Sequence, residues 1–202
     1  MTCRCLPSYN LPGCRSAPLC EPHRIRRATV AKGLLMVFTG DGKGKTTAAL
    51  GMALRAVGHG IKVCVIQFIK GPGHCGERAA AKRFSGLMEF HVTGRGFTWA
   101  SDDIQKDRSA AREGWDQACA VIADGRYGMV ILDELTYLIQ YGFLTEAAVL
   151  AALGQRPGGQ HVVITGRNAS EGLLAVADLV TEMRAVKHPY AAGIKAQRGV
   201  EF

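Results

Sequence analysis

The feature that most constrains this chain is a glycine-rich segment, residues 39–47, with the sequence Thr-Gly-Asp-Gly-Lys-Gly-Lys-Thr-Thr. An apolar run at 33–38 precedes it, and residues 46–57 follow with apolar side chains at helical spacing. A strand-to-helix junction of this kind directs backbone N–H groups and the positive helix end at one point, which favours a polyphosphate. Glycines let the backbone approach the anion, Lys45 supplies a positive charge, and the Thr46 hydroxyl can bind Mg²⁺. The sequence therefore predicts a phosphate-binding loop.

The loop is a shortened variant of the pattern G-x-x-x-x-G-K-[ST]. Thr39 occupies the position of the first glycine, and only three residues separate Gly40 from Gly44. A glycine-lysine-threonine junction between a strand and a helix is still specific. We therefore interpret it as a nucleotide site rather than as an ordinary glycine turn.

Two carboxylates follow a later apolar run. Asp133 and Glu134 come directly after residues 129–132, in the form of a Walker B strand. The carboxyl ends of parallel strands face the crevice where ligands bind. A helix-capping pair is the alternative, and the phosphate-binding loop in the same chain makes it the weaker one. The prediction is that Mg²⁺ is held by the Thr46 hydroxyl and by one or both of the carboxylates Glu134 and Asp133.

The rest of the chain alternates short apolar runs with longer amphipathic stretches, which is typical of βαβ units. This pattern predicts an α/β fold of three layers, of the P-loop (RecA-like) type, with a mostly parallel central sheet. Residues 32–202 form one domain, and the proline-rich residues 1–31 form an extended or disordered basic segment. The expected strands are 33–39, 62–69, 88–92, 129–132, 161–165 and an edge strand at 179–186, and the expected helices are 46–57, 77–84 and 101–123.

Composition excludes some classes of protein. The 202 residues contain no apolar run long enough to span a bilayer. Of the net charge of +8, residues 1–32 contribute +5, from six Lys/Arg against Glu21, so the basic character is mostly that of the tail. A basic tail is only a weak sign of nucleic-acid binding. An odd number of cysteines, seven, favours free thiols in a reducing cytoplasm.

Beyond the loop, the chain from about Gly33 to Phe202 resembles the ATP:corrinoid adenosyltransferase family of cobalamin synthesis and salvage. The resemblance consists of several separate blocks in the right order, which together are more specific than the loop. These blocks are residues 38–49 (FTGDGKGKTTAA), 55–60 (RAVGHG), 67–71 (QFIKG), 76–78 (GER), 96–99 (GFTW), 132–137 (LDELTY), 164–167 (ITGR), 186–188 (VKH) and 193–197 (GIKAQ).

The resemblance implies roles for individual residues. Phe97 and Trp99 are similar to the aromatic pair that approaches the lower face of the corrin ring, although an aromatic pair after a strand is more often part of a core. Catalysis is assigned to Lys45, Thr46 and Glu134. The ATP-binding residues implied are Thr39, Gly40, Asp41, Gly42, Lys43, Gly44, Lys45, Thr46, Thr47, Arg55 and Arg167.

The implied reaction transfers the 5′-deoxyadenosyl group of ATP to Co(I) of a reduced corrinoid and releases triphosphate. Co(I) is a strong nucleophile, so the enzyme needs alignment and leaving-group stabilisation more than a general base. The family places ATP in its loop in the opposite sense to ordinary NTPases. The resemblance also implies Mg²⁺, a flavoprotein electron donor and a homodimer.

Two alternative functions stay open at this stage: a P-loop NTPase or phosphotransferase, and a nucleic-acid-binding ATPase. Relatives often have a charged N-terminal helix that closes over the corrinoid, whereas residues 1–30 here are rich in proline and cysteine. Five histidines show no metal-ligand spacing, so we interpret them as structural or solvent-exposed: His59, His74, His91, His161 and His188.

Overall fold

The computed structural model describes residues 32–71, 75–94, 96 and 104–201. In this part of the chain, six strands form one sheet in the order β3-β2-β4-β5-β1-β6, and every pairing is parallel. The predicted α/β fold with a parallel central sheet is therefore confirmed. The strands are β1 (Leu35–Thr39), β2 (Val63–Gln67), β3 (Met88–Val92), β4 (Met129–Asp133), β5 (His161–Thr165) and β6 (Leu179–Glu182).

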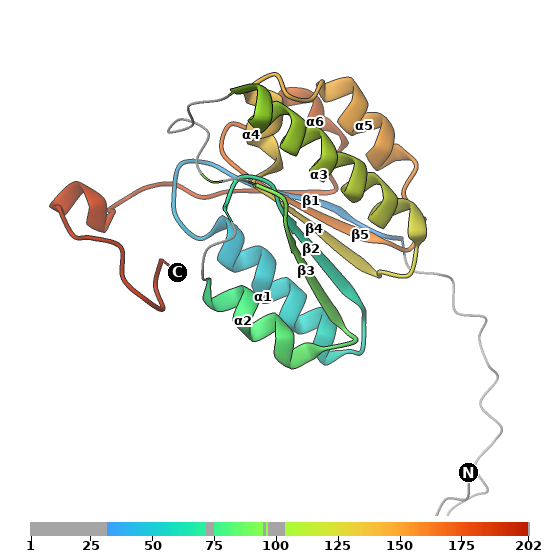
Figure 1. The fold of residues 1–202 in the computed structure, drawn as a ribbon, viewed down its shortest axis with the longest axis horizontal. Coiled ribbons are helices and arrows are strands. Elements are labelled where there is room, and N and C mark those ends of the chain that lie inside the picture. Colours follow the sequence, from blue (N-terminus) through green and yellow to red (C-terminus); the bar gives the residue numbers. More distant parts are fainter. Residues whose placement is uncertain (1–31, 72–74, 95, 97–103, 202) are drawn as a thin grey trace, which may run out of the picture.

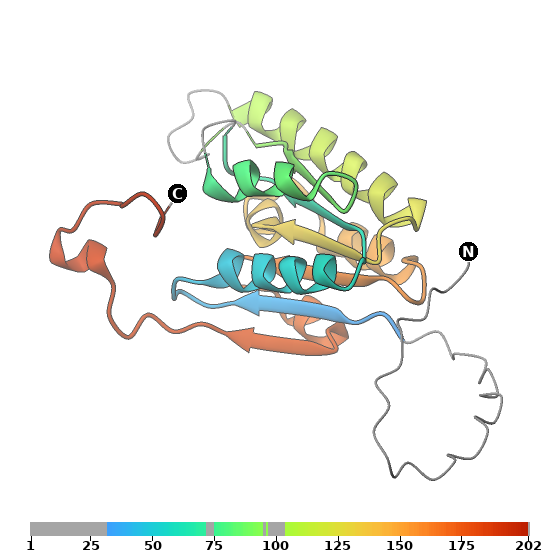
Figure 2. The same cartoon turned by 90° about the horizontal axis from the view of Figure 1, so that it is seen from below.

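Helices cover both faces of the sheet, which gives the three layers visible in Figures 1 and 2. Strand residues alternate between the faces, so Met36 and Phe38 pack with α1, whereas Leu35 and Val37 pack into the opposite core. Near-continuous apolar strands are expected where both faces are buried. The helices are α1 (Lys45–Gly58), α2 (Gly76–Ala81), α3 (Ile104–Asp124), α4 (Leu135–Gln140), α5 (Glu146–Gly154) and α6 (Glu171–Val176).

The predicted elements differ from the observed ones mainly at their ends. The helix predicted at 77–84 is α2 followed by a 3₁₀ turn at Lys82–Phe84, and the edge strand predicted to 186 ends at Glu182. The chain beyond β6 is exposed and has no further strand partner among the described residues. The short helices α4, α5 and α6 were not predicted, because none is long enough to show a clear helical period.

The C-terminal segment, residues 184–201, is here called the arm. It contains one 3₁₀ turn, Pro189–Ala192, and most of its side chains are exposed. Figures 1 and 2 show the arm extending beyond the carboxyl edge of the sheet, with its end turned back toward the domain. The carboxyl edge is also where ligands bind in open α/β sheets.

Two further findings concern the class of protein. No helix in the described ranges is long and apolar enough to cross a membrane. Cys64, Cys75 and Cys119, the cysteines within those ranges, are free thiols. The segment 1–31, predicted to be extended or disordered, lies outside the described residues and stays a prediction.

Candidate functional site

The predicted phosphate-binding loop connects β1 to α1 at the carboxyl edge of the sheet. Gly40 and Gly44 adopt positive φ angles of 92° and 115°, a region that favours glycine. Gly42 lies against the start of the arm, since an added Cβ would come within 2.7 Å of the Arg184 carbonyl group. No side chain caps the N-terminus of α1, and its first turn contains no acidic residue. Its N–H groups are therefore available to an anion.

Lys45, the first residue of α1, curls back over this loop. Its Nζ donates to the carbonyl oxygens of Gly40 and Gly42, at 2.6 and 2.7 Å. Burial lowers the pKa of Lys45 from its usual value, and nearby Arg167 adds to this effect, while Asp41 and Glu134 oppose it. The ammonium group is thus partly desolvated and next to another cation. A bound anion would offset both the desolvation of the Lys45 ammonium group and its repulsion by Arg167.

Asp133 forms a buried hydrogen-bond centre behind the loop. Its Oδ1 accepts from the hydroxyls of Thr46 and Thr165, at 2.8 and 2.6 Å, and its Oδ2 accepts from the Gln67 side-chain amide at 2.8 Å. Because the Thr46 hydroxyl donates its proton to Asp133, its lone pairs are free to bind a cation on the other side. Asp133 therefore orients Thr46.

Glu134 is the most unusual residue of the site. Its backbone is left-handed, with φ 65° and ψ 23°, a conformation that costs a non-glycine residue energy. Its Oε2 is buried and has no hydrogen-bond partner among the described residues. Burial raises the pKa of this carboxyl to about 7, and adjacent Asp133 contributes. A buried, unpartnered carboxylate is a natural ligand for a cation.

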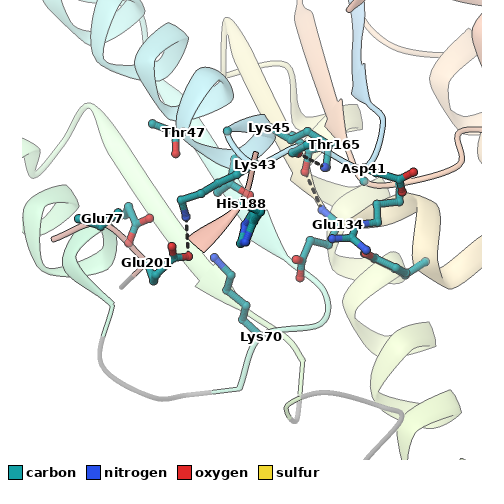
Figure 3. Close-up of a pocket in the computed structure, with 17 residues that line it drawn as sticks. Asp41, Lys43, Lys45, Thr47, Lys70, Glu77, Glu134, Thr165, His188 and Glu201 are labelled. Atoms are coloured by element: carbon teal, nitrogen blue, oxygen red, sulfur yellow. Dashed lines mark hydrogen bonds and ion pairs between the residues drawn. The ribbon is translucent and has the colours of Figure 1, made fainter. Parts of the chain in front are cut away.

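These groups surround a cavity of about 250 Å³ at the carboxyl edge of the sheet. Figure 3 shows Lys43, Lys45, Lys70 and His188 around its centre, with Glu134 on one side and Glu201 on the other. The lining residues are Asp41, Gly42, Lys43, Gly44, Lys45, Thr46, Thr47, Lys70, Glu77, Glu134, Tyr137, Thr165, Gly166, Arg167, His188, Val200 and Glu201.

The structure brings most of the predicted site residues together. Residues 41–47, Glu134 and Arg167 line the cavity. Thr39, Gly40 and Asp133 lie directly behind its wall, where Thr39 Oγ1 accepts from the Ala169 backbone N–H at 3.1 Å and Asp133 has both oxygens engaged.

One predicted ATP-binding residue, Arg55, is not brought into the site. Arg55 is exposed in the last turn of α1 and does not line the cavity. It lies ten residues from Lys45, which corresponds to about 15 Å along the helix axis. Phe97 and Trp99 lie outside the described residues, so their assignment stays a prediction.

Sequence reasoning missed seven lining side chains: Lys70, Glu77, Tyr137, Thr165, His188, Val200 and Glu201. The first five fall within the motif blocks of the family resemblance, which is the signal that could have found them. His188, which we expected to be structural or solvent-exposed, caps the 3₁₀ turn Pro189–Ala192 and also lines the cavity. Glu201 gave no signal, since it lies 158 residues from its ion-pair partner Lys43.

The parallel sheet, the glycine loop with an uncapped helix N-terminus, Lys45 and the Walker B carboxylates define a P-loop nucleotide-binding protein. Comparison with known proteins narrows this class. The family model for ATP:corrinoid adenosyltransferase BtuR/CobO/CobP matches residues 31–202. The chain belongs to this family.

Similar curated proteins agree. The chain is 49% identical to the corrinoid adenosyltransferase of Pseudomonas aeruginosa over 179 residues, covering 89% of this chain and 88% of that protein. It is 48% identical to the corrinoid adenosyltransferase of Escherichia coli K12, with 89% and 90% covered. It is 46% identical to corrinoid adenosyltransferase CobA of Salmonella typhimurium, with the same coverage.

Among solved structures, the flagellar accessory protein FlaH from Methanocaldococcus jannaschii aligns with a TM-score of 0.46 and 12% identity. The alignment covers 75% of this chain and 71% of that protein. The fold assignment rests instead on the sheet order and the phosphate-binding loop.

Proposed function

We propose that this protein transfers the 5′-deoxyadenosyl group of ATP to the Co(I) of a reduced corrinoid, with release of triphosphate. The observation that carries the proposal is the cavity itself, in a chain of this family. It combines an uncapped helix N-terminus, the partly desolvated Lys45 and the buried carboxylate of Glu134. These groups suit a polyphosphate with its counter-cation.

The residues of the loop act on the leaving group. We infer that the backbone N–H groups of residues 43–46 and the Lys45 ammonium stabilise the negative charge that increases as the C5′–O bond breaks, since these residues line the cavity. Stabilising that charge lowers the barrier without a general base, because Co(I) is itself the nucleophile. What the protein must add is alignment of C5′ with cobalt.

The residues present fit a Mg²⁺ ion. Glu134 offers an unpartnered carboxylate oxygen, and Thr46 offers hydroxyl lone pairs because its proton goes to Asp133. We propose these two residues as its ligands and Asp133 as the group that orients Thr46. When bound, Mg²⁺ neutralises phosphate charge, as it does in other P-loop proteins.

Product analysis tests the function. Purified protein is incubated with ATP, Mg²⁺ and chemically reduced cobalamin, and the light-sensitive absorbance of the carbon–cobalt product is recorded. We expect this product with stoichiometric triphosphate. Formation of ADP and phosphate without a carbon–cobalt bond would instead establish the NTPase or phosphotransferase alternative.

A first prediction concerns the metal ligand. Glu134→Gln should lower turnover by about a hundredfold, because it removes the charge that holds Mg²⁺ beside the triphosphate. Raised Mg²⁺ should restore part of the activity. The measurement is a Mg²⁺ titration of initial rate for both proteins, with Glu77→Gln, also on the cavity wall, as the matched carboxylate control. Equal loss at every Mg²⁺ concentration would remove Glu134 from the metal's coordination.

A second prediction concerns Phe97 and Trp99, whose role is taken from the resemblance. If the pair removes the lower axial ligand from Co(II), Phe97→Ala or Trp99→Ala should slow adenosylation about tenfold or more when a weak reductant must reduce Co(II) on the enzyme. Pre-reduced Co(I) lacks that ligand and should bypass the defect. Equal loss with both cobalt states would contradict the role, and a loss of folding would favour a place in the core.

We also propose a cytoplasmic homodimer that receives its electron from a flavoprotein. Free thiols at Cys64, Cys75 and Cys119 are compatible with a reducing compartment. Apolar side chains exposed on β6 and α6, namely Val176, Leu179 and Val180, are compatible with contact to a second copy. Sedimentation equilibrium gives the oligomeric state directly.

A further inference from the structure

The arm is attached to the phosphate-binding loop at both of its ends. Immediately before its first residue, the Met183 carbonyl accepts from the Gly42 N–H at 2.6 Å. At its end, the Glu201 carboxylate pairs with Lys43 at 2.6 Å. Two consecutive loop residues therefore hold the two ends, and His188, Val200 and Glu201 of the arm line the nucleotide cavity. The arm is one wall of that cavity.

His188 is oriented by a local contact in this wall. Its Nδ1 accepts a hydrogen bond from the Tyr190 backbone N–H at 3.2 Å, at the start of the 3₁₀ turn Pro189–Ala192. A backbone N–H can only donate, so an imidazole that accepts at Nδ1 carries its proton on Nε2. The Nε2–H group is thus a donor, and within the described ranges no protein acceptor engages it.

The surroundings of His188 indicate the kind of acceptor it would meet. Figure 3 shows the imidazole among the side chains of Lys43, Lys45 and Lys70 in the cavity. Lysine ammonium groups donate and cannot accept. Of the carboxylates that line the same cavity, Glu201 is already engaged by Lys43. A donor in a ring of cations suits a ligand with many anionic oxygens.

We propose that His188 is a ligand of the triphosphate, donating its Nε2–H to a non-bridging phosphate oxygen. The inference rests on the proposed function, which supplies the triphosphate, and it assigns the arm a role in substrate binding. One hydrogen bond to a charged acceptor contributes about tenfold to affinity. The alternative is a purely structural role, in which His188 only caps the 3₁₀ turn.

Two substitutions distinguish these roles, because each keeps one function of the imidazole and loses the other. The two functions are the acceptor at Nδ1 and the donor at Nε2. His188→Asn keeps a short side-chain acceptor for the Tyr190 N–H, since asparagine is a good N-cap, but loses the distant donor. His188→Gln keeps an N–H donor near the position of Nε2 but is a poor cap. His59→Asn is the matched control, because His59 is exposed at the far end of α1 and does not line the cavity.

The experiment is calorimetric titration of the full chain with Mg²⁺ and inorganic tripolyphosphate, with adenosine as a second ligand. We expect His188→Asn to weaken tripolyphosphate binding about tenfold, with His188→Gln and His59→Asn within about threefold of the parent. Adenosine affinity should be unchanged in all variants. Thermal melts check that each variant is folded.

The opposite pattern overturns the proposal. A structural cap predicts that His188→Gln is the damaged variant and His188→Asn is normal. A loss confined to adenosine would place His188 at the nucleoside. No corrinoid is present in this titration, so a protein that binds tripolyphosphate through His188 but forms no carbon–cobalt bond would refute the proposed function and leave this inference standing.

Discussion

Lys45→Ala is expected to lower turnover by two to three orders of magnitude, on the order of 3–4 kcal/mol of transition-state stabilisation. The ammonium group is half-buried and lies against the carbonyl oxygens of Gly40 and Gly42, at the centre of the loop. Its charge therefore acts in a site where water screens it poorly. Initial rates with saturating ATP, Mg²⁺ and reduced cobalamin measure the effect.

A matched lysine shows whether the effect is local. Lys62, before β2, is exposed and does not line the cavity, so Lys62→Ala should retain the parent's rate. The fold should survive Lys45→Ala, because the lost hydrogen bonds, to Gly40 and Gly42, are local to the loop and Lys45 is not part of the hydrophobic core. A Lys45→Ala rate within twofold of the parent would contradict the assignment of the loop to triphosphate.

Asp133→Ala should have the largest effect on stability, on the order of 3–5 kcal/mol. The carboxylate is fully buried, and its removal leaves the hydroxyls of Thr46 and Thr165 and the amide of Gln67 without their acceptor. Unpaired buried donors carry their full desolvation cost. Urea unfolding of both proteins gives the difference in the free energy of unfolding.

Asp133→Asn is the matched variant. Its Oδ1 still accepts from the two threonines, and Gln67 can turn its amide so that Oε1, which has no partner in the described structure, accepts from the new NH₂ group. We expect it to cost less than half as much as Asp133→Ala. Similar losses in the two variants would show that charge, rather than the hydrogen-bond count, stabilises this centre.

The central strands of the sheet, β1, β2, β4 and β5, could be predicted from the sequence because they are buried on both faces. The run 129–132 is uniformly apolar and 161–165 has an apolar centre, and their ends match β4 and β5 within one residue. The short helices could not be predicted in this way. In α5 (Glu146–Gly154) the residues are almost all apolar or small, so no polar face marks a helical period.

The site was predictable where one local motif specifies it. Residues 41–47 and Glu134 follow from strand-to-loop junctions, which the sequence reveals directly. The arm was not predictable, because Glu201 reaches Lys43 only through the tertiary fold. Arg55 is a different case: its assignment came from the resemblance alone, whereas the predicted helix 46–57 already placed it about 15 Å along the helix axis from Lys45.

Glu134 has one more consequence, which concerns evolution and engineering rather than catalysis. In the free protein this residue combines a left-handed backbone, a buried carboxylate oxygen without a partner and a pKa raised by burial. Each of these lowers stability, and glycine or asparagine would tolerate the backbone better. Selection for thermal stability alone would therefore favour replacement of Glu134. If Glu134 holds Mg²⁺ as we propose, an engineered thermostable variant must keep this residue to remain active.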